Sequence, residues 1–131
     1  ASIRGLHLLL AEDNELNAEI AARLLNDEGA TVQVVRDGQQ AIDAFASRPQ
    51  GTYDAILMDI MMPKIDGYTA TRVIRSTNRQ DAKAIPIIAM TAHVFDEDVK
   101  QCLEAGMNAH LPKPLQMEKV VSTIARLCKR K

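Results

Sequence analysis

The middle of the chain contains the stretch Ala55-Ile56-Leu57-Met58, which is wholly apolar and ends in the carboxylate of Asp59. Three other apolar runs also end in a polar residue, and each such run predicts a buried strand. They are residues 7–11 before Glu12-Asp13, residues 85–90 before Thr91, and residues 109–112 before Lys113. Helical patterns separate the runs, so we expect a parallel sheet that is covered on both faces.

The order of the elements predicts a single α/β domain over residues 1–131, since this length fits one domain. A β-branched stretch at residues 31–35 adds a further strand. Five strand–helix alternations with right-handed crossovers favour a doubly wound (βα)5 sheet of strand order 2-1-3-4-5. Residues 76–84 are expected to form a polar connector. Asn14 is expected to cap a first helix whose apolar face comprises Leu16, Ile20, Leu24 and Leu25.

Bulk composition excludes several classes of function. The net charge is −1 and aromatic residues make up 3% of the chain, which argues against nucleic acid as a partner. No apolar run approaches the roughly 20 residues of a membrane span, so no direct membrane contact is expected. Cys102 and Cys128 lack metal-type spacing and are expected to be reduced thiols, which fits a cytoplasmic location. A monomer is the default expectation.

The polar residues at the strand ends predict one pocket, because the carboxyl ends of parallel strands share one edge of the sheet. The strand order would bring together Glu12, Asp13 and Asp59, with Thr91 and Lys113 beside them. Three carboxylates about 5 Å apart would repel by roughly 10 kcal/mol at an effective dielectric near 20. Such a cluster needs a proton, a cation or the ammonium of Lys113. An all-oxygen set favours Mg²⁺, for which Mn²⁺ can substitute, and the absence of His and Cys argues against zinc.

Phosphoryl transfer to a carboxylate is the chemistry that this set of groups favours. It needs a nucleophile, alignment and neutralisation of charge. Asp59 is the best candidate for the nucleophile because it is the lone carboxylate of its strand end, whereas Glu12 and Asp13 form a pair suited to holding the metal ion. Taken singly, these residues could be turn acids, helix caps or surface charges; their occurrence together at four strand ends favours the phosphoryl site.

Four longer stretches resemble the receiver domains of response regulators, the CheY-like group, in order and spacing over nearly the whole chain. They are residues 8–14 (LLLAEDN), 57–67 (LMDIMMPKIDG), 87–92 (IIAMTA) and 106–115 (GMNAHLPKPL). The Asn14…Asn17 pair and residues 105–107 are most similar to receivers fused to hybrid histidine kinases. The resemblance implies a flavodoxin-like fold and a role in two-component signal transduction. It also implies that the chain is a piece excised from a longer hybrid histidine kinase.

The resemblance further implies a role for each site residue. Asp59 would accept a phosphoryl group from phosphohistidine. Asp13, Asp59 and the backbone carbonyl of Met61 would ligate Mg²⁺, and Glu12 would act through a bound water. Lys113 would pair with Asp59 and then with a phosphoryl oxygen, and the Lys113–Pro114 bond would be cis. Thr91 would bind another phosphoryl oxygen and act as a switch residue. The implied partners are a histidine kinase domain and/or a histidine phosphotransfer domain.

One position departs from the family pattern. His110 stands three residues before Lys113, where these domains usually carry Tyr or Phe as a second switch residue. Imidazole could swing inward in the same way, or His110 could be a part-exposed strand residue without that role. Ala92 and His93 are expected at the rim through which water reaches the site.

The same residues bear on two alternatives to a phosphoacceptor domain. A degenerate interaction domain that keeps the fold without phosphorylation is disfavoured by the complete set of site residues. A true phosphatase usually needs a second acid/base aspartate close after the nucleophile, but position 61 is Met. The domain is therefore not expected to be a stand-alone turnover enzyme, although it would promote its own phosphorylation and slow dephosphorylation.

Overall fold

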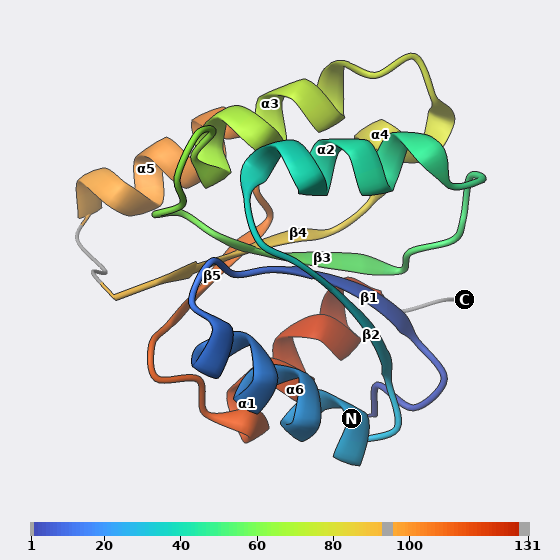
Figure 1. Ribbon diagram of the computed structural model, residues 1–131, viewed down its shortest axis with the longest axis vertical. Helices are drawn as coiled ribbons and strands as arrows, with labels where there is room; N and C mark the ends of the chain where they lie inside the picture. The colour runs from blue at the N-terminus through green and yellow to red at the C-terminus, as the bar shows by residue number, and fades with distance from the viewer. Residues whose placement is uncertain (1, 93–95, 129–131) are drawn as a thin grey trace.

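The computed structural model describes residues 2–92 and 96–128, and its centre is a five-stranded sheet with helices on both faces (Figure 1). The strands lie in the order β2-β1-β3-β4-β5, and all neighbours are parallel. Their bounds are β1 (His7–Ala11), β2 (Thr31–Val35), β3 (Ala55–Asp59), β4 (Ile87–Thr91) and β5 (Ala109–Pro112). The predicted fold and strand order are confirmed.

The helices divide between the two faces of the sheet, with α2, α3, α4 and α5 above it and α1 and α6 below it in Figure 1. Their bounds are α1 (Glu15–Asp27), α2 (Gly38–Ser47), α3 (Gly67–Ser76), α4 (Gln80–Ala84), α5 (Asp96–Ala105) and α6 (Met117–Leu127). Successive residues of a strand point to opposite faces of the sheet. Leu9 therefore joins the core between the sheet and α2, while Leu8 and Leu10 join the core between the sheet and helices α1 and α6. Both cores are therefore built from the same strands.

The first helix begins as predicted, but of its predicted apolar face only Leu25 is buried. Asn14 caps it by accepting a hydrogen bond from the Asn17 N–H at 2.9 Å. The buried residues are Ala18, Ala21 and Leu25. Leu16, Ile20 and Leu24 are instead 64%, 50% and 37% exposed. Small alanines let the helix lie close to the sheet, which turns the larger aliphatic side chains outward.

The predicted polar connector over residues 76–84 is wrong in one respect, because it contains the short helix α4. Arg79 holds this segment against α2: its guanidinium donates to the Phe45 and Arg48 carbonyl oxygens at 2.7 and 2.8 Å. The same group lies 4.5 Å from the centre of the Phe45 ring and pairs with Asp81 at 2.9 Å. Five residues are too few for a recognisable helical period, so tertiary contacts decide this element.

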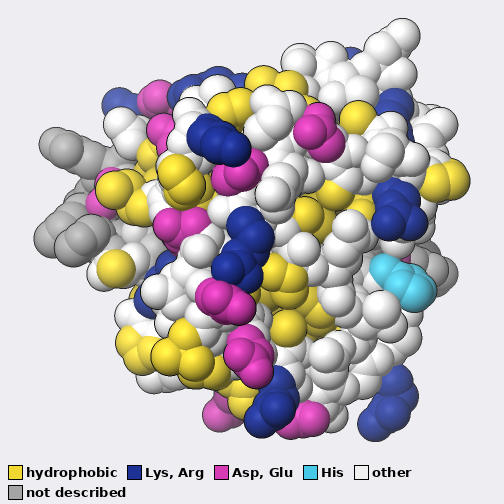
Figure 2. All heavy atoms as spheres, in the orientation of Figure 1, with side chains coloured by type: hydrophobic (Ala, Val, Ile, Leu, Met, Phe, Trp, Pro, Cys, Tyr) yellow, Lys and Arg dark blue, Asp and Glu magenta, His cyan; other side chains and the backbone are white. Residues whose placement is uncertain are grey.

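Acidic and basic side chains alternate over the face drawn in Figure 2, with apolar side chains between them. This distribution agrees with the small net charge of −1. No helix in the described part of the chain combines the length and apolarity that a membrane crossing requires.

Candidate functional site

The register of the sheet places the predicted site residues at one edge. Asp59 ends β3 and pairs in register with Met90, the residue before Thr91. Ala11, the residue before Glu12, pairs with Met58, and Thr91 pairs with Pro112, the residue before Lys113. Neighbouring parallel strands of the sheet therefore bring all of these polar groups to the edge formed by the carboxyl ends of the strands.

Three carboxylates meet at this edge. Glu12, Asp13 and Asp59 each offer one oxygen, and these three oxygens all lie within 4.8 Å of one another. Glu12 and Asp59 are each only 3% exposed, whereas Asp13 is exposed to solvent. The set is wholly oxygen and strongly anionic, with one open side, which fits a hard divalent cation such as Mg²⁺ that keeps several water ligands.

The ammonium group of Lys113 bridges the two buried acids. Its Nζ lies 2.8 Å from Oε1 of Glu12 and 3.0 Å from Oδ2 of Asp59. The pairing with Asp59 agrees with the expectation from the family, whereas the equally close pairing with Glu12 could not be predicted from the sequence. One ammonium between two carboxylates offsets only part of their repulsion, so the cluster remains anionic.

The pKa values of the three groups reflect this arrangement. Burial and then the hydrogen bond with Glu12 raise the pKa of Asp59 to about 7, against the opposing effect of Lys113. Burial also tends to raise the pKa of Glu12, but hydrogen bonds with Asp59, Lys113 and the Asn14 N–H outweigh it and lower that pKa. Burial disfavours the charged form of Lys113, yet its two acidic partners raise its pKa. In the metal-free site, burial and Glu12 therefore favour the protonated form of Asp59.

Backbone groups next to the acids fix their orientation. The Met61 N–H donates to Oδ1 of Asp59 at 3.2 Å, and the Asn14 N–H donates to Oε2 of Glu12 at 3.3 Å. The Met61 side chain is 75% exposed. The turn after β3 thus folds back over its own aspartate, which keeps the backbone of Met61 beside the carboxylate.

Thr91 and the Lys113–Pro114 peptide lie beside this cluster at the ends of β4 and β5, whereas His110 lines a separate groove. Thr91 is buried, and its carbonyl oxygen accepts from the Lys113 N–H at 2.9 Å. The Lys113–Pro114 peptide is cis, as the resemblance implied. Ala92 is exposed at the end of β4, and His93 lies outside the described residues. His110 is half-buried on β5 and lines a groove with Leu103 of α5 and Thr123 of α6.

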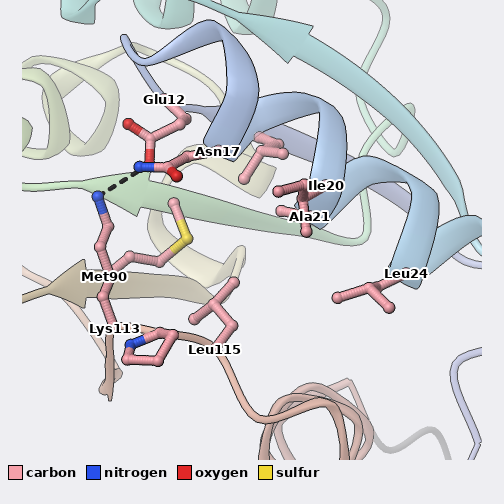
Figure 3. A pocket seen from close by; sticks show the side chains of 10 residues that line it. Glu12, Asn17, Ile20, Ala21, Leu24, Met90, Lys113 and Leu115 are labelled. Atoms are coloured by element: carbon pink, nitrogen blue, oxygen red, sulfur yellow. Dashed lines mark hydrogen bonds and ion pairs between the residues drawn. The ribbon is translucent and has the colours of Figure 1, made fainter.

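An apolar groove of about 370 Å³ opens beside the site, and the sequence did not predict it (Figure 3). Ile20, Ala21 and Leu24 of α1 point into it from one side, and Met90 and Leu115 line the other. Its polar end is the Lys113–Glu12 pair, drawn as a dashed line in Figure 3. The groove forms because Ile20 and Leu24 of α1 face outward instead of packing in the core.

Comparison with known proteins agrees with this geometry. Residues 8–125 match the family model of the response regulator receiver domain. Histidine kinase 1 of Arabidopsis thaliana is 38% identical over 98% of this chain. The osmosensing histidine protein kinase SLN1 of Saccharomyces cerevisiae is 38% identical over 95% of it. The chain spans only 13% and 10% of the lengths of these two proteins.

Solved structures show the same fold. The receiver domain of the sensor histidine kinase PA1611 from Pseudomonas aeruginosa superimposes with a TM-score of 0.85 at 38% identity, covering 96% of this chain and 99% of that one. That structure has a magnesium ion coordinated in its active site cleft. Full-length ShkA in complex with AMPPNP matches with a TM-score of 0.79 at 42% identity, covering 94% of this chain and 24% of that one.

Proposed function

Because the chain belongs to the family of response regulator receiver domains, whose function is Mg²⁺-dependent phosphoryl transfer to an aspartate, we propose that Asp59 is its phosphoacceptor. The observation that carries this assignment is the position of Asp59. Asp59 is a buried carboxylate that lies within 4.8 Å of Glu12 and Asp13 and in contact with Lys113, and it stands alone at the end of β3. Glu12 is equally buried and also contacts Lys113, but it follows β1 together with Asp13, as a pair suited to holding a metal ion. No other group of three His, Cys, Asp or Glu residues with this spacing occurs in the described parts of the chain.

The donor in this proposal is a phosphohistidine. An oxygen of the Asp59 carboxylate attacks phosphorus, the new O–P bond forms, and the N–P bond breaks with its electron pair returning to the imidazole nitrogen. The attacking group must be ionised, whereas burial and Glu12 favour its protonated form in the metal-free site. Loss of this proton is therefore coupled to the arrival of a cation.

The metal ligands would be carboxylate oxygens of Asp13 and Asp59 and the backbone carbonyl of Met61, with Glu12 acting through a water molecule. A bound Mg²⁺ supplies neutralisation of the charge that gathers on the phosphoryl oxygens. The donor atoms are the hard oxygens that this ion prefers, and Mn²⁺, which favours the same ligands, would substitute.

Lys113 and Thr91 would bind the phosphoryl oxygens. In the unphosphorylated site Lys113 already pairs with Asp59, so it can move to an oxygen of the new group over a short distance. Thr91 would then draw its strand end inward, and His110 would follow as the second switch residue. Ala92 and His93 would set the access of water that hydrolyses the acyl phosphate. The changed surface would comprise α5, β5 and α6.

The apolar groove suggests where the phosphohistidine protein docks. The donor must approach Asp59 closely, and the groove is continuous with the Lys113–Glu12 pair beside it. Ile20 and Leu24 are half-exposed there, so burying them against a partner would add affinity. We infer that a histidine kinase domain or a histidine phosphotransfer domain covers this groove during transfer.

The parent protein would be a hybrid histidine kinase with this domain on the cytoplasmic side of the membrane. The proposal includes no nucleic-acid partner and no direct membrane contact, and the isolated domain would be a monomer that catalyses no turnover reaction beyond its own slow dephosphorylation. The second candidate, an interaction domain that is never phosphorylated, would keep the fold but would not require the buried acid pair with its ammonium.

Labelling with acetyl phosphate tests the assignment. The wild-type chain should gain one phosphoryl group in the presence of Mg²⁺ and none with a chelator, as intact-mass spectrometry would show. Asp59→Ala should gain none, and Asp54→Ala, which changes an aspartate at the opposite end of β3, should label as the wild type does. Undiminished labelling of Asp59→Ala would refute the assignment, and an unlabelled wild type would favour the interaction domain.

A further inference from the structure

We propose that Asp37 and Gly38, which begin α2, are positioning residues for the loop of residues 60–66, which carries the Met61 carbonyl; this inference rests on the proposed function. Neither residue belongs to the strand-end cluster of Glu12, Asp13 and Asp59. They meet the loop through Lys64 and Ile65, on the far side of Met61 along the chain.

The buried residues on either side of Met61 anchor the start of the 60–66 loop in the core, but the residues that follow them need support from outside the loop. The Met61 side chain is 75% exposed and therefore does not anchor the carbonyl of the same residue. Lys64 has a φ of 67°, in the left-handed region that residues with a side chain rarely adopt. The base of the loop is closed by the Gly67 N–H, which donates to the Ile60 carbonyl at 2.9 Å. A loop with one strained residue keeps its shape only where its neighbours hold it.

Gly38 supports the loop by allowing a close approach. A Cβ atom added at Gly38 would lie 2.9 Å from the Cβ of Ile65 and closer still to the Ile65 carbonyl oxygen. Gly38 is not among the glycines with positive φ, so lack of space rather than backbone conformation excludes a side chain there. The start of α2 and the backbone of the loop are thus in direct contact, and any side chain at position 38 must push the loop away.

Asp37 supports the loop from the adjacent position. It is 7% exposed, and its Oδ1 caps α2 by accepting from the Gln40 N–H at 2.8 Å. Its other oxygen, Oδ2, lies 3.7 Å from Nζ of Lys64, the residue with the left-handed backbone. The cap fixes the carboxylate, which faces the ammonium of Lys64. The Lys64 side chain is 74% exposed, so this ion pair is the weaker of the two contacts between α2 and the loop.

The two contacts act on a metal ligand without touching the metal. A displacement at Ile65 or Lys64 is passed along the short loop toward Met61, whose N–H holds Asp59 and whose carbonyl faces the ion in the proposed function. Groups that orient metal ligands from outside the coordination sphere commonly change metal affinity by about 10–100-fold when they are mutated.

Isothermal titration of the metal-free protein with MgCl₂ tests this inference. Gly38→Ala should bind Mg²⁺ about tenfold more weakly than the wild type, and acetyl phosphate should still label it fully when Mg²⁺ is raised in proportion. The matched control is Gly51→Ala, where φ is 83° and nothing lies within 4 Å of an added Cβ. That variant should lose stability through backbone strain and still bind Mg²⁺ as the wild type does. A folded Gly38→Ala with wild-type Mg²⁺ affinity would overturn the proposal.

Asp37→Asn gives a second, independent test should Gly38→Ala fail to fold. Asn keeps the cap for Gln40 but loses the charge that faces Lys64, so Mg²⁺ affinity should fall by about two- to fivefold, and Lys64→Gln should lower it by a similar factor. Unchanged affinity in both variants would contradict a role for Asp37. Unchanged Mg²⁺ affinity in the variants would refute only the positioning role of Asp37 and Gly38. The proposed function would fail by a different result, namely a wild type that shows no Mg²⁺-dependent labelling.

Discussion

The ammonium of Lys113 donates a hydrogen bond to Glu12 across 2.8 Å, joining residues that are 101 positions apart in the chain. Glu12 therefore competes with Asp59 for the ammonium group of Lys113 before any phosphoryl group arrives. Phosphorylation would add oxygens that draw Lys113 toward position 59, and Glu12 would then lose its partner. The charge balance of the site is thus set by three groups rather than by one aspartate and one lysine.

Lys113→Ala should destabilise the metal-free protein. Glu12 and Asp59 would remain buried without their shared cation, and breaking such a pair costs about 3 kcal/mol. Urea unfolding in a buffer with chelator would measure the loss. Lys83→Ala, an exposed lysine of α4, is the control and should change the free energy of unfolding by less than about 0.5 kcal/mol. Equal stability of the two variants would show that Lys113 offsets no buried charge.

The stability of the metal-free protein should depend on pH through Asp59. Its pKa is raised from 3.8 to about 7 in the folded state, so the folded protein keeps a proton that the unfolded chain loses. The stability from this group is full below the unfolded pKa and is lost as pH rises through about 7. Between about pH 5 and pH 8 the wild type should therefore lose about 2–3 kcal/mol relative to Asp59→Asn, which cannot titrate.

This pH window separates Asp59 from its partners. The lowered pKa of Glu12 affects stability only as pH falls below its ordinary value of 4.5. The raised pKa of Lys113 affects it only near and above 10.5. Urea unfolding of both proteins at a series of pH values is the measurement. Parallel profiles for the wild type and Asp59→Asn would mean that the Asp59 carboxyl is ionised throughout.

Much of the fold could be predicted because its signals are local. The bounds of β1, β2 and β5 match the predicted runs, since short apolar or β-branched stretches bounded by polar residues define strands well. The buried face of α1 could not be predicted, because Leu16, Ile20 and Leu24 have the same helical spacing as a core stripe. Only the packing of Ala18 and Ala21 against the sheet decides which stripe is buried.

The members of the site could be predicted from the shared edge of the parallel strands, but not its internal contacts. Nothing in the sequence indicates that Lys113 pairs with Glu12, because side-chain geometry at 2.8 Å is set after the strands assemble. The contact of Gly38 with Ile65 was equally invisible. Asp37-Gly38 indicates only a turn when taken alone.

The groove on α1 gives a prediction that separates protein donors from small ones. Ile20→Ser should slow phosphoryl transfer from a histidine phosphotransfer domain by about tenfold or more, since a buried interface anchor is commonly worth 1–2 kcal/mol or more. Labelling by acetyl phosphate should change by less than about twofold, because a small donor needs no docking surface. Rapid-quench measurement of both reactions is the test.

Leu103→Ser is the control for this groove, since Leu103 is 62% exposed and lies on α5, on the other face of the sheet. It should leave both donors unaffected. Equal slowing by Ile20→Ser and Leu103→Ser would point to a general effect on the fold. Unchanged transfer from the protein donor in Ile20→Ser would remove the groove from the interface.

A last prediction concerns Arg75, which connects α3 to the turn between α5 and β5. Its guanidinium donates to the Gly106 carbonyl at 3.0 and 2.8 Å, to the Ala82 carbonyl at 3.1 Å and to Oδ1 of Asn108 at 2.8 Å. Burial lowers its pKa, and these acceptors compensate for that burial. Arg75→Lys offers a single ammonium in place of this planar fork and leaves acceptors unsatisfied. We expect it to lose about 1–3 kcal/mol of stability.

Arg72→Lys is the matched control, because Arg72 is an exposed residue of the same helix and should change stability by less than about 0.5 kcal/mol. Hydrogen exchange adds a local measurement. The Met107 N–H donates to the Cys102 carbonyl at 2.9 Å, and the Asn108 N–H donates to the Ile87 carbonyl at 2.8 Å. Both amides should exchange faster in Arg75→Lys, because Arg75 fixes the residues on either side of Met107. Protection equal to that of the wild type would show that the turn holds its shape without the guanidinium.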